Sequence, residues 1–423
     1  MTSVVVRPGR VSGSIRAPPS KSYTHRALVA GHLARRRYAV INPLDSDDTR
    51  ATARALEALG SRIRFGPQRW TITPSPAKGR RIAQVDCGES GTTLRFAAAL
   101  AALSDRPVRL RGRGRLPQRP LAGLFDALES LGASCQRPRG EGNLPATVHG
   151  PLRGGAVRLS ASVSSQFVSA LLLVLPVVPE DSTLELVGPV VSEPYIEATL
   201  AVLQHHRIRC ARHGRRFSIP GGQRYLGSGL VVPGDASSAA YFWTAAAITG
   251  GRVQVTGIPR RWPQADLSVL DLLRSAGATV RRSPDGATVG GGRLRGFRID
   301  LTGTPDLYPL AGVLAASMPE RSRLQGAAHV VLKESDRRAG TRRLATAMGA
   351  EVRPDGGGMA IRGRTHPRAL RMHGLSDHRL VMSAGVAALV GNGPSRIADS
   401  RAVTKSFPGF WESLSTLQGR AGR

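Results

Sequence analysis

A pattern that returns about every 70 residues constrains this 423-residue chain more than any other feature of its sequence. Apolar segments with helical character open with a serine or an aspartate six times, at intervals of 70, 74, 71, 71 and 70 residues. The six openings are Ser20, Ser90, Ser164, Asp235, Asp306 and Ser376. Self-similarity at a fixed period indicates a repeated supersecondary unit, so six such units account for the whole length.

Each unit continues with a second helical segment, and four of these segments end in a similar phrase that closes with a glycine. The glycines are Gly60, Gly132, Gly277 and Gly349. Glycine is the usual residue past a helix end, because it accepts the left-handed conformation there. β-branched stretches predict strands between and after the helices, at 38–41, 61–65, 183–187, 252–256 and 278–281. Each unit therefore reads as strand, helix, strand, helix and one or two further strands.

The two kinds of helix predict the fold class. The first helix of each unit is apolar almost all round, which is typical of a helix buried inside a domain, whereas the second is amphipathic. Three units of this size could form one domain, and a Pro-Gly pair at 233–234 precedes the fourth unit. We expect an α/β (α+β) chain of two domains with three units each. The predicted domains are residues 18–233, and residues 1–17 plus 234–423.

Composition narrows the class of partner. The formal net charge of +31, from 60 basic and 29 acidic residues, favours anionic partners, either nucleic acid or small phosphorylated acids. Aromatic residues are only 4%, which leaves little material for stacking on bases. The three cysteines form no CxxC pair, so we expect no disulfide framework, no zinc site and a reducing cytoplasm. The longest apolar run, 167–178, is too short to span a membrane, and we expect no membrane partner.

Polar and cationic groups at the predicted helix starts suggest a binding site for anions. Lys21, Ser22 and Arg26 fall in the first two turns after Ser20, where free backbone N–H groups and the positive helix end attract phosphate or carboxylate. An ordinary capped helix with solvated charges is the alternative. Capping alone does not explain cations at helix starts, because cations oppose the helix dipole there. We place six cations at such starts: Lys21, Arg119, Lys333, Arg337, Arg379 and Lys405.

Phrases spread nearly end to end resemble those of the 5-enolpyruvylshikimate-3-phosphate synthase (3-phosphoshikimate 1-carboxyvinyltransferase) family of enolpyruvyl transferases. They are PSKSYTHRAL, LDSDDT, GESGTTLR, LPQRPL, SVSSQF, VSEPYI, GDASSAAYF, PDLYPLA, LKESDR, SDHR and TKSFP. The resemblance implies a two-domain inside-out α/β barrel of six βαβαββ-type repeats, three per domain, with no metal or organic cofactor. It also implies transfer of the enolpyruvyl group of phosphoenolpyruvate to the 5-hydroxyl of shikimate 3-phosphate, with release of phosphate, in aromatic amino acid biosynthesis.

The resemblance also assigns roles to matching residues of this chain. It implies that Lys21 touches both substrates, that Asp306 holds the reacting hydroxyl as general base, and that Glu334 exchanges a proton with the methylene carbon. The implied residues for shikimate 3-phosphate are Lys21, Ser22, Arg26, Ser164, Ser165, Gln166, Ser192, Tyr195, Asp306 and Lys333. Those for phosphoenolpyruvate are Lys21, Gly91, Arg119, Gln166, Arg337, His378, Arg379 and Lys405.

Some positions depart from the family pattern. Glu89 stands where the family usually has Asn, so we leave it out of the binding set, and His329 stands where Asn is frequent. The segment Tyr23-Thr24-His25 replaces smaller residues between Lys21 and Arg26.

Two alternative functions share some of these features. The sister transferase acting on UDP-N-acetylglucosamine has an Asn after its first-helix Lys and a reactive Cys, whereas this chain has Ser22 and no Cys in 116–121. A nucleic-acid binder is suggested by the Arg-rich segment 109–115, which we interpret as a solvated strand edge. We therefore expect no specific nucleic-acid partner, and a monomer.

Overall fold

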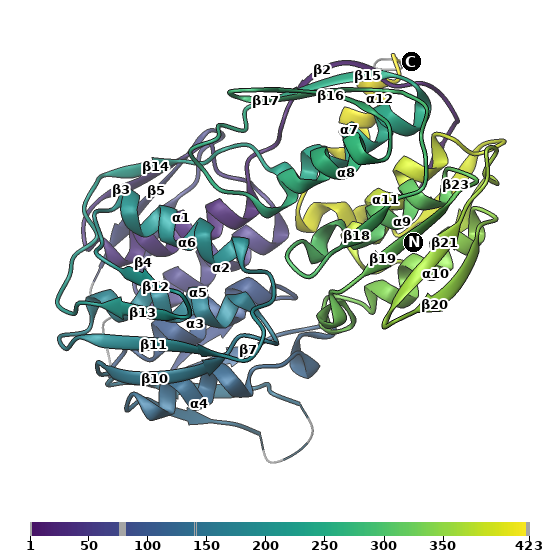
Figure 1. Cartoon of the computed structure of the whole chain (residues 1–423). Helices are drawn as coiled ribbons and strands as arrows, with labels where there is room; N and C mark the ends of the chain where they lie inside the picture. Colours follow the sequence, from purple (N-terminus) through teal and green to yellow (C-terminus); the bar gives the residue numbers. More distant parts are fainter. Residues whose placement is uncertain (1, 76–81, 139, 141, 420–423) are drawn as a thin grey trace. The chain divides into compact units, whose positions relative to one another are not determined.

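The computed structural model describes residues 2–75, 82–138, 140 and 142–419. The chain divides into two compact units (Figure 1). We call Pro19–Pro233 the N-terminal unit, and Met1–Pro18 together with Gly234–Arg423 the C-terminal unit.

Three sheets with one common strand order build the N-terminal unit. The first two strands of each sheet are parallel, and the remaining neighbours are antiparallel. In spatial order, the strands of the first sheet are β14 (Gly229–Val231), β3 (Tyr38–Ile41), β5 (Arg69–Pro74) and β4 (Ser61–Arg64). Those of the second are β6 (Ala83–Asp86), β7 (Val108–Arg111), β9 (Ala146–His149) and β8 (Ser134–Gln136). Those of the third are β10 (Gly155–Ser160), β11 (Ser182–Val187), β13 (Arg216–Ile219) and β12 (Ala211–His213).

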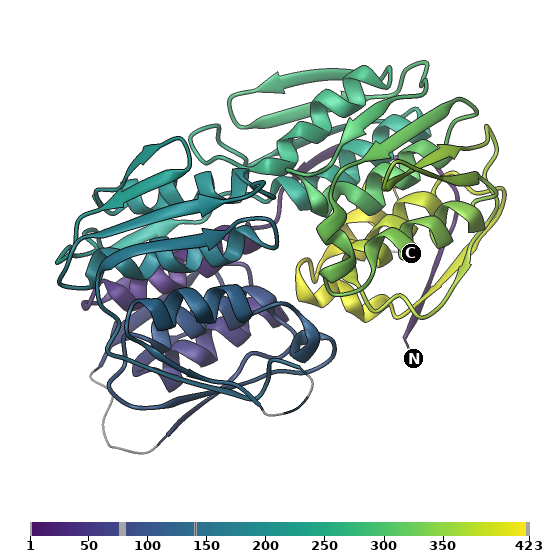
Figure 2. The same cartoon turned by 60° about the horizontal axis from the view of Figure 1, so that its bottom comes forward.

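The helices of the N-terminal unit pack against one another on the inner side of these sheets (Figures 1 and 2). The first helices of the three repeats are buried almost all round, as their composition predicts: α1 (Lys21–Leu33), α3 (Gly91–Ala101) and α5 (Ser165–Val174). The second helices keep one exposed side: α2 (Asp47–Ala58), α4 (Ala122–Ser130) and α6 (Pro194–His205). Short 3-10 helices are η1 (Leu116–Gln118) and η2 (Leu175–Val177).

The C-terminal unit repeats the same plan with one change in its last sheet. In spatial order, the strands of its first sheet are β2 (Ser12–Arg16), β15 (Arg252–Thr256), β17 (Gly286–Gly290) and β16 (Thr279–Ser283). Those of the second are β18 (Arg298–Asp300), β19 (Arg321–Gln325), β21 (Gly358–Arg362) and β20 (Glu351–Asp355). Those of the last are β22 (Arg371–Met372), β23 (Ser395–Ala398) and β1 (Ser3–Val6). Among the described residues the last sheet has three strands, and the N-terminal strand β1 pairs antiparallel with β23 where the other repeats place a hairpin. The sixth repeat is therefore not a complete βαβαββ unit.

Inner and outer helices alternate in this unit too. The inner helices are α7 (Ala236–Thr249), α9 (Tyr308–Ala316) and α11 (His378–Ala388), which pack on one another. The others are α8 (Val269–Ser275), α10 (Arg337–Ala347) and α12 (Phe410–Leu417). The 3-10 helices are η3 (Ala265–Ser268), η4 (Pro305–Leu307), η5 (Ala328–Leu332) and η6 (Ser400–Lys405).

The glycines that close the second helices confirm the interpretation of the repeat. Gly60, Gly132, Gly277 and Gly349 all have positive φ, between 88° and 105°. In the third repeat, which lacks the glycine, Arg207 takes φ 57° after α6. A left-handed residue is thus kept at that helix end even where the side chain opposes it.

Candidate active site

The starts of several helices in the N-terminal unit meet at one end of the helix pack. Ser90 caps α3 by accepting from the Thr93 amide at 3.2 Å, and Ser164 caps α5 by accepting from the Gln166 amide at 3.2 Å. The Gln166 Nε2 donates to Thr92 Oγ1 at 3.1 Å, which joins the start of α5 to that of α3. Predicted residues therefore occupy first turns: Lys21 and Ser22 on α1, Gly91 on α3, and Ser165 and Gln166 on α5 after Ser164.

Lys21 forms an ion pair that the sequence did not reveal. Its Nζ lies 2.9 Å from Asp48 Oδ2, and the two side chains are 16% and 10% exposed. Asp48 belongs to the first turn of α2, which Ser46 and Thr49 cap reciprocally. The phrase LDSDDT indicated a polar helix start, but it assigned no partner to Asp48. The ammonium of Lys21 is thus held at the helix starts and remains partly open to solvent.

Arg26 lies inside the N-terminal unit and joins α1 to α6 and to α5, where its Nη2 donates to Ser169 Oγ at 3.3 Å. Its Nε donates to Thr199 Oγ1 at 2.8 Å, and its Nη2 donates to the Tyr195 carbonyl at 2.9 Å. Its Nη1 donates to the Ser22 carbonyl at 2.9 Å. Burial lowers the pKa of Arg26 to about 10. The guanidinium therefore anchors the start of α6, where Tyr195 lies and where Ser192 adopts φ 55°.

Gly91 lies directly under two guanidinium groups. A Cβ placed on Gly91 would be 2.5 Å from Arg119 Nη1 and 2.6 Å from Arg95 Nη1. Arg119 is 7% exposed, and its backbone carbonyl accepts from Asn143 Nδ2 at 3.0 Å. Only glycine leaves room for Arg119 to cross the start of α3 in this way.

Three of the six cations predicted at helix starts lie elsewhere. Arg119 follows η1, Lys333 follows η5, and Lys405 is the last residue of η6. Asp336 takes the cap of α10 by accepting from the Ala339 amide at 2.9 Å, so Lys333 precedes that helix in extended backbone. Pro408 disfavours helical backbone in the residue before it, so η6 does not continue into α12.

Two predicted helix openings are also shifted. Asp306 lies within η4, directly after Pro305 and before α9 begins at Tyr308. Asp377 rather than Ser376 caps α11, by accepting from the Arg379 amide at 2.8 Å.

Arg337 is the centre of the predicted site residues in the C-terminal unit. This buried guanidinium donates to a different carboxylate from each nitrogen: Nη1 to Asp306 Oδ1 at 2.6 Å, Nη2 to Glu334 Oε2 at 2.8 Å, and Nε to Asp377 Oδ2 at 2.8 Å. Burial alone would lower the pKa of Arg337, but Asp377, Glu334 and Asp306 raise it above its ordinary value. Asp306, which lies within η4, and Glu334, which follows η5, are thereby brought to one cation.

The start of α11 supplies a second cation. Arg379 Nη2 donates to Asp306 Oδ2 at 2.7 Å, so both oxygens of Asp306 accept from guanidinium groups. His378 is 1% exposed, and its Nδ1 lies 3.7 Å from Asp377 Oδ1. The Nζ of Lys405 donates to the Ser376 carbonyl at 3.4 Å. His378, Arg379 and Lys405 therefore gather around the segment that precedes α11.

Two buried groups near this cluster were not predicted to matter. Asp266, 1% exposed, accepts from the Ser237 hydroxyl, and burial followed by the charge of Asp306 raises its pKa to about 7. Burial and the nearby Lys333 lower the pKa of His329 to about 4, so its imidazole is neutral at pH 7. Nothing in the sequence context of Asp266 distinguishes a buried carboxyl from an ordinary helix-capping one.

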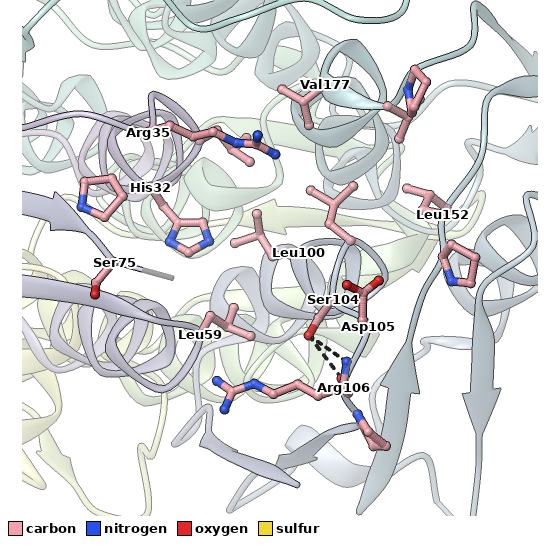
Figure 3. A pocket seen from close by; sticks show the side chains of 17 residues that line it. His32, Arg35, Leu59, Ser75, Leu100, Ser104, Asp105, Arg106, Leu152 and Val177 are labelled. Carbon is pink, nitrogen blue, oxygen red and sulfur yellow. Dashed lines mark hydrogen bonds between the residues drawn. The ribbon is translucent and has the colours of Figure 1, made fainter. Parts of the chain in front are cut away.

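A hollow of about 1120 Å³ lies at the other end of the helix pack in the N-terminal unit (Figure 3). Its walls come from the C-terminal ends of α1 and α3 and the segment after η2, with Leu100 between His32 and Leu152. None of the predicted site residues is among the described residues that line it. The candidate site and this hollow are therefore separate features of the unit.

Across the described ranges, no helix combines the length and apolarity needed to cross a membrane. Over the same ranges, no group of three or more His, Cys, Asp and Glu side chains is arranged to hold a metal ion.

Comparison with known proteins gives one consistent result. The family model described as EPSP synthase (3-phosphoshikimate 1-carboxyvinyltransferase) matches residues 5–414. A 3-phosphoshikimate 1-carboxyvinyltransferase of Halobacterium salinarum is 40% identical over 97% of this chain and 98% of its own length. One of Thermococcus kodakarensis is 39% identical over 98% of this chain and 100% of its own. The solved EPSP synthase of Acinetobacter baumannii superposes with a TM-score of 0.81 at 25% identity, covering 100% of this chain and 98% of that one.

Proposed function

Because the chain belongs to the EPSP synthase family, we propose that it transfers the enolpyruvyl group of phosphoenolpyruvate to the 5-hydroxyl of shikimate 3-phosphate. The products are 5-enolpyruvylshikimate 3-phosphate and inorganic phosphate. The predicted two-domain inside-out α/β fold is that of the solved relative.

The observation that carries the proposal is the placement of Asp306 and Glu334 on one buried guanidinium, that of Arg337. Addition of a hydroxyl to the enol double bond of phosphoenolpyruvate needs one group that takes a proton and another that gives one, and paired carboxylates can do both. We assign the hydroxyl proton to Asp306, which is 21% exposed, and the methylene proton to Glu334, which is 16% exposed. Loss of that proton and of phosphate from the tetrahedral intermediate completes the reaction.

Anion binding is assigned within each unit separately. In the N-terminal unit, we propose that the helix starts bind shikimate 3-phosphate through Ser22, Ser164, Ser165, Gln166, Ser192 and Tyr195, and phosphoenolpyruvate through Gly91, Arg119 and Gln166, with Lys21 touching both. Arg26 holds the start of α6 in the arrangement described above, which supports a role in shaping this site as well. In the C-terminal unit, Arg337, His378, Arg379 and Lys405 are proposed for phosphoenolpyruvate, and Asp306 and Lys333 for shikimate 3-phosphate.

The choice of acceptor is tested by a phosphate-release assay with phosphoenolpyruvate and either shikimate 3-phosphate or UDP-N-acetylglucosamine. We expect phosphate release when phosphoenolpyruvate is combined with shikimate 3-phosphate, and none when it is combined with UDP-N-acetylglucosamine. Equal or greater release with the sugar nucleotide would instead assign the chain to the sister activity.

We further propose that the chain works as a monomer in the cytoplasm. Cys87 and Cys135 are free and buried, which fits a reducing compartment. Light scattering coupled to size exclusion should give the mass of one chain, 44.8 kDa.

A further inference from the structure

A chain of buried hydrogen bonds runs behind Lys21, from one helix to the next. We propose that His25 is a positioning residue, which acts through Thr52 and Thr93 to fix Asp48 and thereby the ammonium of Lys21. The inference rests on the proposed function, because it takes Lys21 to contact substrate.

The geometry joins three helices of the N-terminal unit. His25 Nδ1 on α1 lies 2.7 Å from Thr52 Oγ1 on α2, and Thr52 Oγ1 lies 2.7 Å from Thr93 Oγ1 on α3. Thr93 Oγ1 in turn reaches Ser90 Oγ at 2.8 Å and the Asp48 carbonyl at 3.3 Å. His25, Thr52 and Thr93 are at most 2% exposed. We call these three side chains the relay.

The direction of the hydrogen bonds follows from counting protons. Thr93 directs its only hydroxyl proton to Asp48 or Ser90, so its oxygen accepts from Thr52. Thr52 has then spent its own proton and must accept from His25, which places the imidazole proton on Nδ1. The reverse order would put the proton on Nε2, which has no hydrogen-bond partner among the described residues. A buried N–H without an acceptor is rare and costly, so the first order is favoured.

The same geometry keeps His25 neutral. A second ring proton would sit on Nε2, where no acceptor is described. The charged groups that face the ring are Lys21 and Arg26, and with burial as the largest cause they lower its pKa well below the ordinary value. A neutral donor at this place adds no positive charge behind Lys21, yet it still orients the hydroxyls that reach Asp48.

The relay offers an advantage that the ion pair alone lacks. Asp48 pairs with Lys21 through its carboxylate while its carbonyl accepts from Thr93. Both ends of the residue are therefore held, and the ammonium is placed by rigid elements rather than by a flexible pair. Catalytic groups lose efficiency steeply when they are displaced, so a break in the relay should reach turnover.

Thr52→Val removes the middle hydroxyl at nearly constant shape, and Thr52→Ser keeps it. We expect kcat with shikimate 3-phosphate and phosphoenolpyruvate to fall about tenfold in Thr52→Val, which is about 1.4 kcal/mol of barrier, and to stay within about twofold in Thr52→Ser. The matched control is His32→Leu, on the same helix. His32 Nδ1 lies 2.8 Å from Ser61 Oγ at the opposite end of α1, and kcat should be unchanged.

A second cycle tests whether the relay acts through Lys21. In a Lys21→Ala background, Thr52→Val should no longer change kcat or the affinity for shikimate 3-phosphate measured by calorimetry. A loss that persists in that background, or an equal loss in His32→Leu, would overturn the proposal in favour of general destabilisation.

Nitrogen-15 NMR of labelled histidine reads the relay without any turnover. His25 should show a protonated Nδ1 and an unprotonated Nε2 throughout pH 5–8. The opposite tautomer, or titration within that range, would overturn the inference. Absence of enolpyruvyl transfer by the unmodified protein would refute the proposed function instead, and the two failures are thus distinguishable.

Discussion

Arg337 Nη1 lies 2.6 Å from Asp306 Oδ1, and the Arg337 side chain is only 2% exposed. Each of two further carboxylates, Glu334 and Asp377, accepts from another nitrogen of the same guanidinium. One cation therefore organises three carboxylates of the C-terminal unit. An anionic substrate that enters here would compete with carboxylates already bound to Arg337 and Arg379.

Removal of that cation should destabilise the protein. Arg337→Met leaves three neighbouring carboxylates without their common partner, and the free energy of unfolding should fall by about 3–5 kcal/mol. Urea denaturation measures this change in the free energy of unfolding. The control is Arg282→Met, whose exposed pair with Asp271 should contribute less than about 1 kcal/mol. Equal stability of Arg337→Met and the unmodified protein would contradict the role of Arg337.

The two proposed proton-transfer groups should be needed for turnover and not for folding. We expect Asp306→Ala and Glu334→Gln each to lower kcat about a hundredfold or more, the scale of general acid–base groups. Steady-state kinetics with matched thermal melts separates the two effects. Near-normal kcat in either variant would remove that residue from the mechanism.

Lysine is rare in this chain, with Lys21, Lys78, Lys333 and Lys405 the only four among 60 basic residues. Three of the four belong to the motifs of the proposed site. An ammonium is compact, whereas a guanidinium is larger and planar, so Lys21→Arg should crowd the space beside Asp48. We expect kcat/KM to fall about a hundredfold, or roughly 2.7 kcal/mol.

Lys78→Arg is the control, at a position outside the described residues, and its kcat/KM should equal that of the unmodified protein. If Lys21→Arg keeps the activity of the unmodified protein, Lys21 contributes only its positive charge and the argument from its size is wrong.

Gly91→Ala should displace the guanidinium groups of Arg119 and Arg95. The added methyl would meet Arg119 Nη1 at 2.5 Å, which forces the guanidinium to move. We expect the KM for phosphoenolpyruvate to rise about tenfold, about 1.4 kcal/mol of lost binding, with a smaller effect on kcat. Gly123→Ala on α4 is the control, because its nearest neighbour, Phe167, would be 3.7 Å away. An unchanged KM in Gly91→Ala would contradict the placement of phosphoenolpyruvate beside Arg119.

Asp266 predicts a pH dependence of stability. Its pKa is raised from 3.8 to about 7, so between these values the folded protein holds a proton that the unfolded chain has released. The free energy of unfolding should therefore fall as pH rises from about 4 to about 7, by at most about 1.4 kcal/mol per pH unit. Asp266→Asn should remove this component, whereas the exposed Asp271→Asn should not. Denaturation at a series of pH values measures the slope, and an identical slope in Asp266→Asn would contradict the assignment.

The sequence predicts the repeat and much of its local structure, because those signals are local. The predicted strand 38–41 has the same bounds as β3, and the helix-ending glycines take the expected backbone. Ser90 and Ser164 cap helices as their residue types suggest. Such features depend on period, composition and cap chemistry, which neighbouring residues carry.

The contacts that define the candidate site depend on tertiary structure and could not be read from the chain. The partner of Lys21 is Asp48, 27 residues away, and Arg26 hydrogen-bonds to Thr199, 173 residues away. Lys333 and Lys405 stand in polar segments that resemble helix starts, yet the helices begin later. Polar composition marks the region in which a helix begins, but it does not say which residue opens the first turn.

The central claim is that this chain moves an intact enolpyruvyl group. The most direct measurement is carbon-13 and phosphorus-31 NMR of a reaction containing labelled phosphoenolpyruvate, shikimate 3-phosphate and the purified protein. The account predicts that a vinyl ether attached to the 5-oxygen and inorganic phosphate form together in a 1:1 ratio. Phosphate released without a vinyl ether, or no reaction with shikimate 3-phosphate while UDP-N-acetylglucosamine is converted, would contradict it.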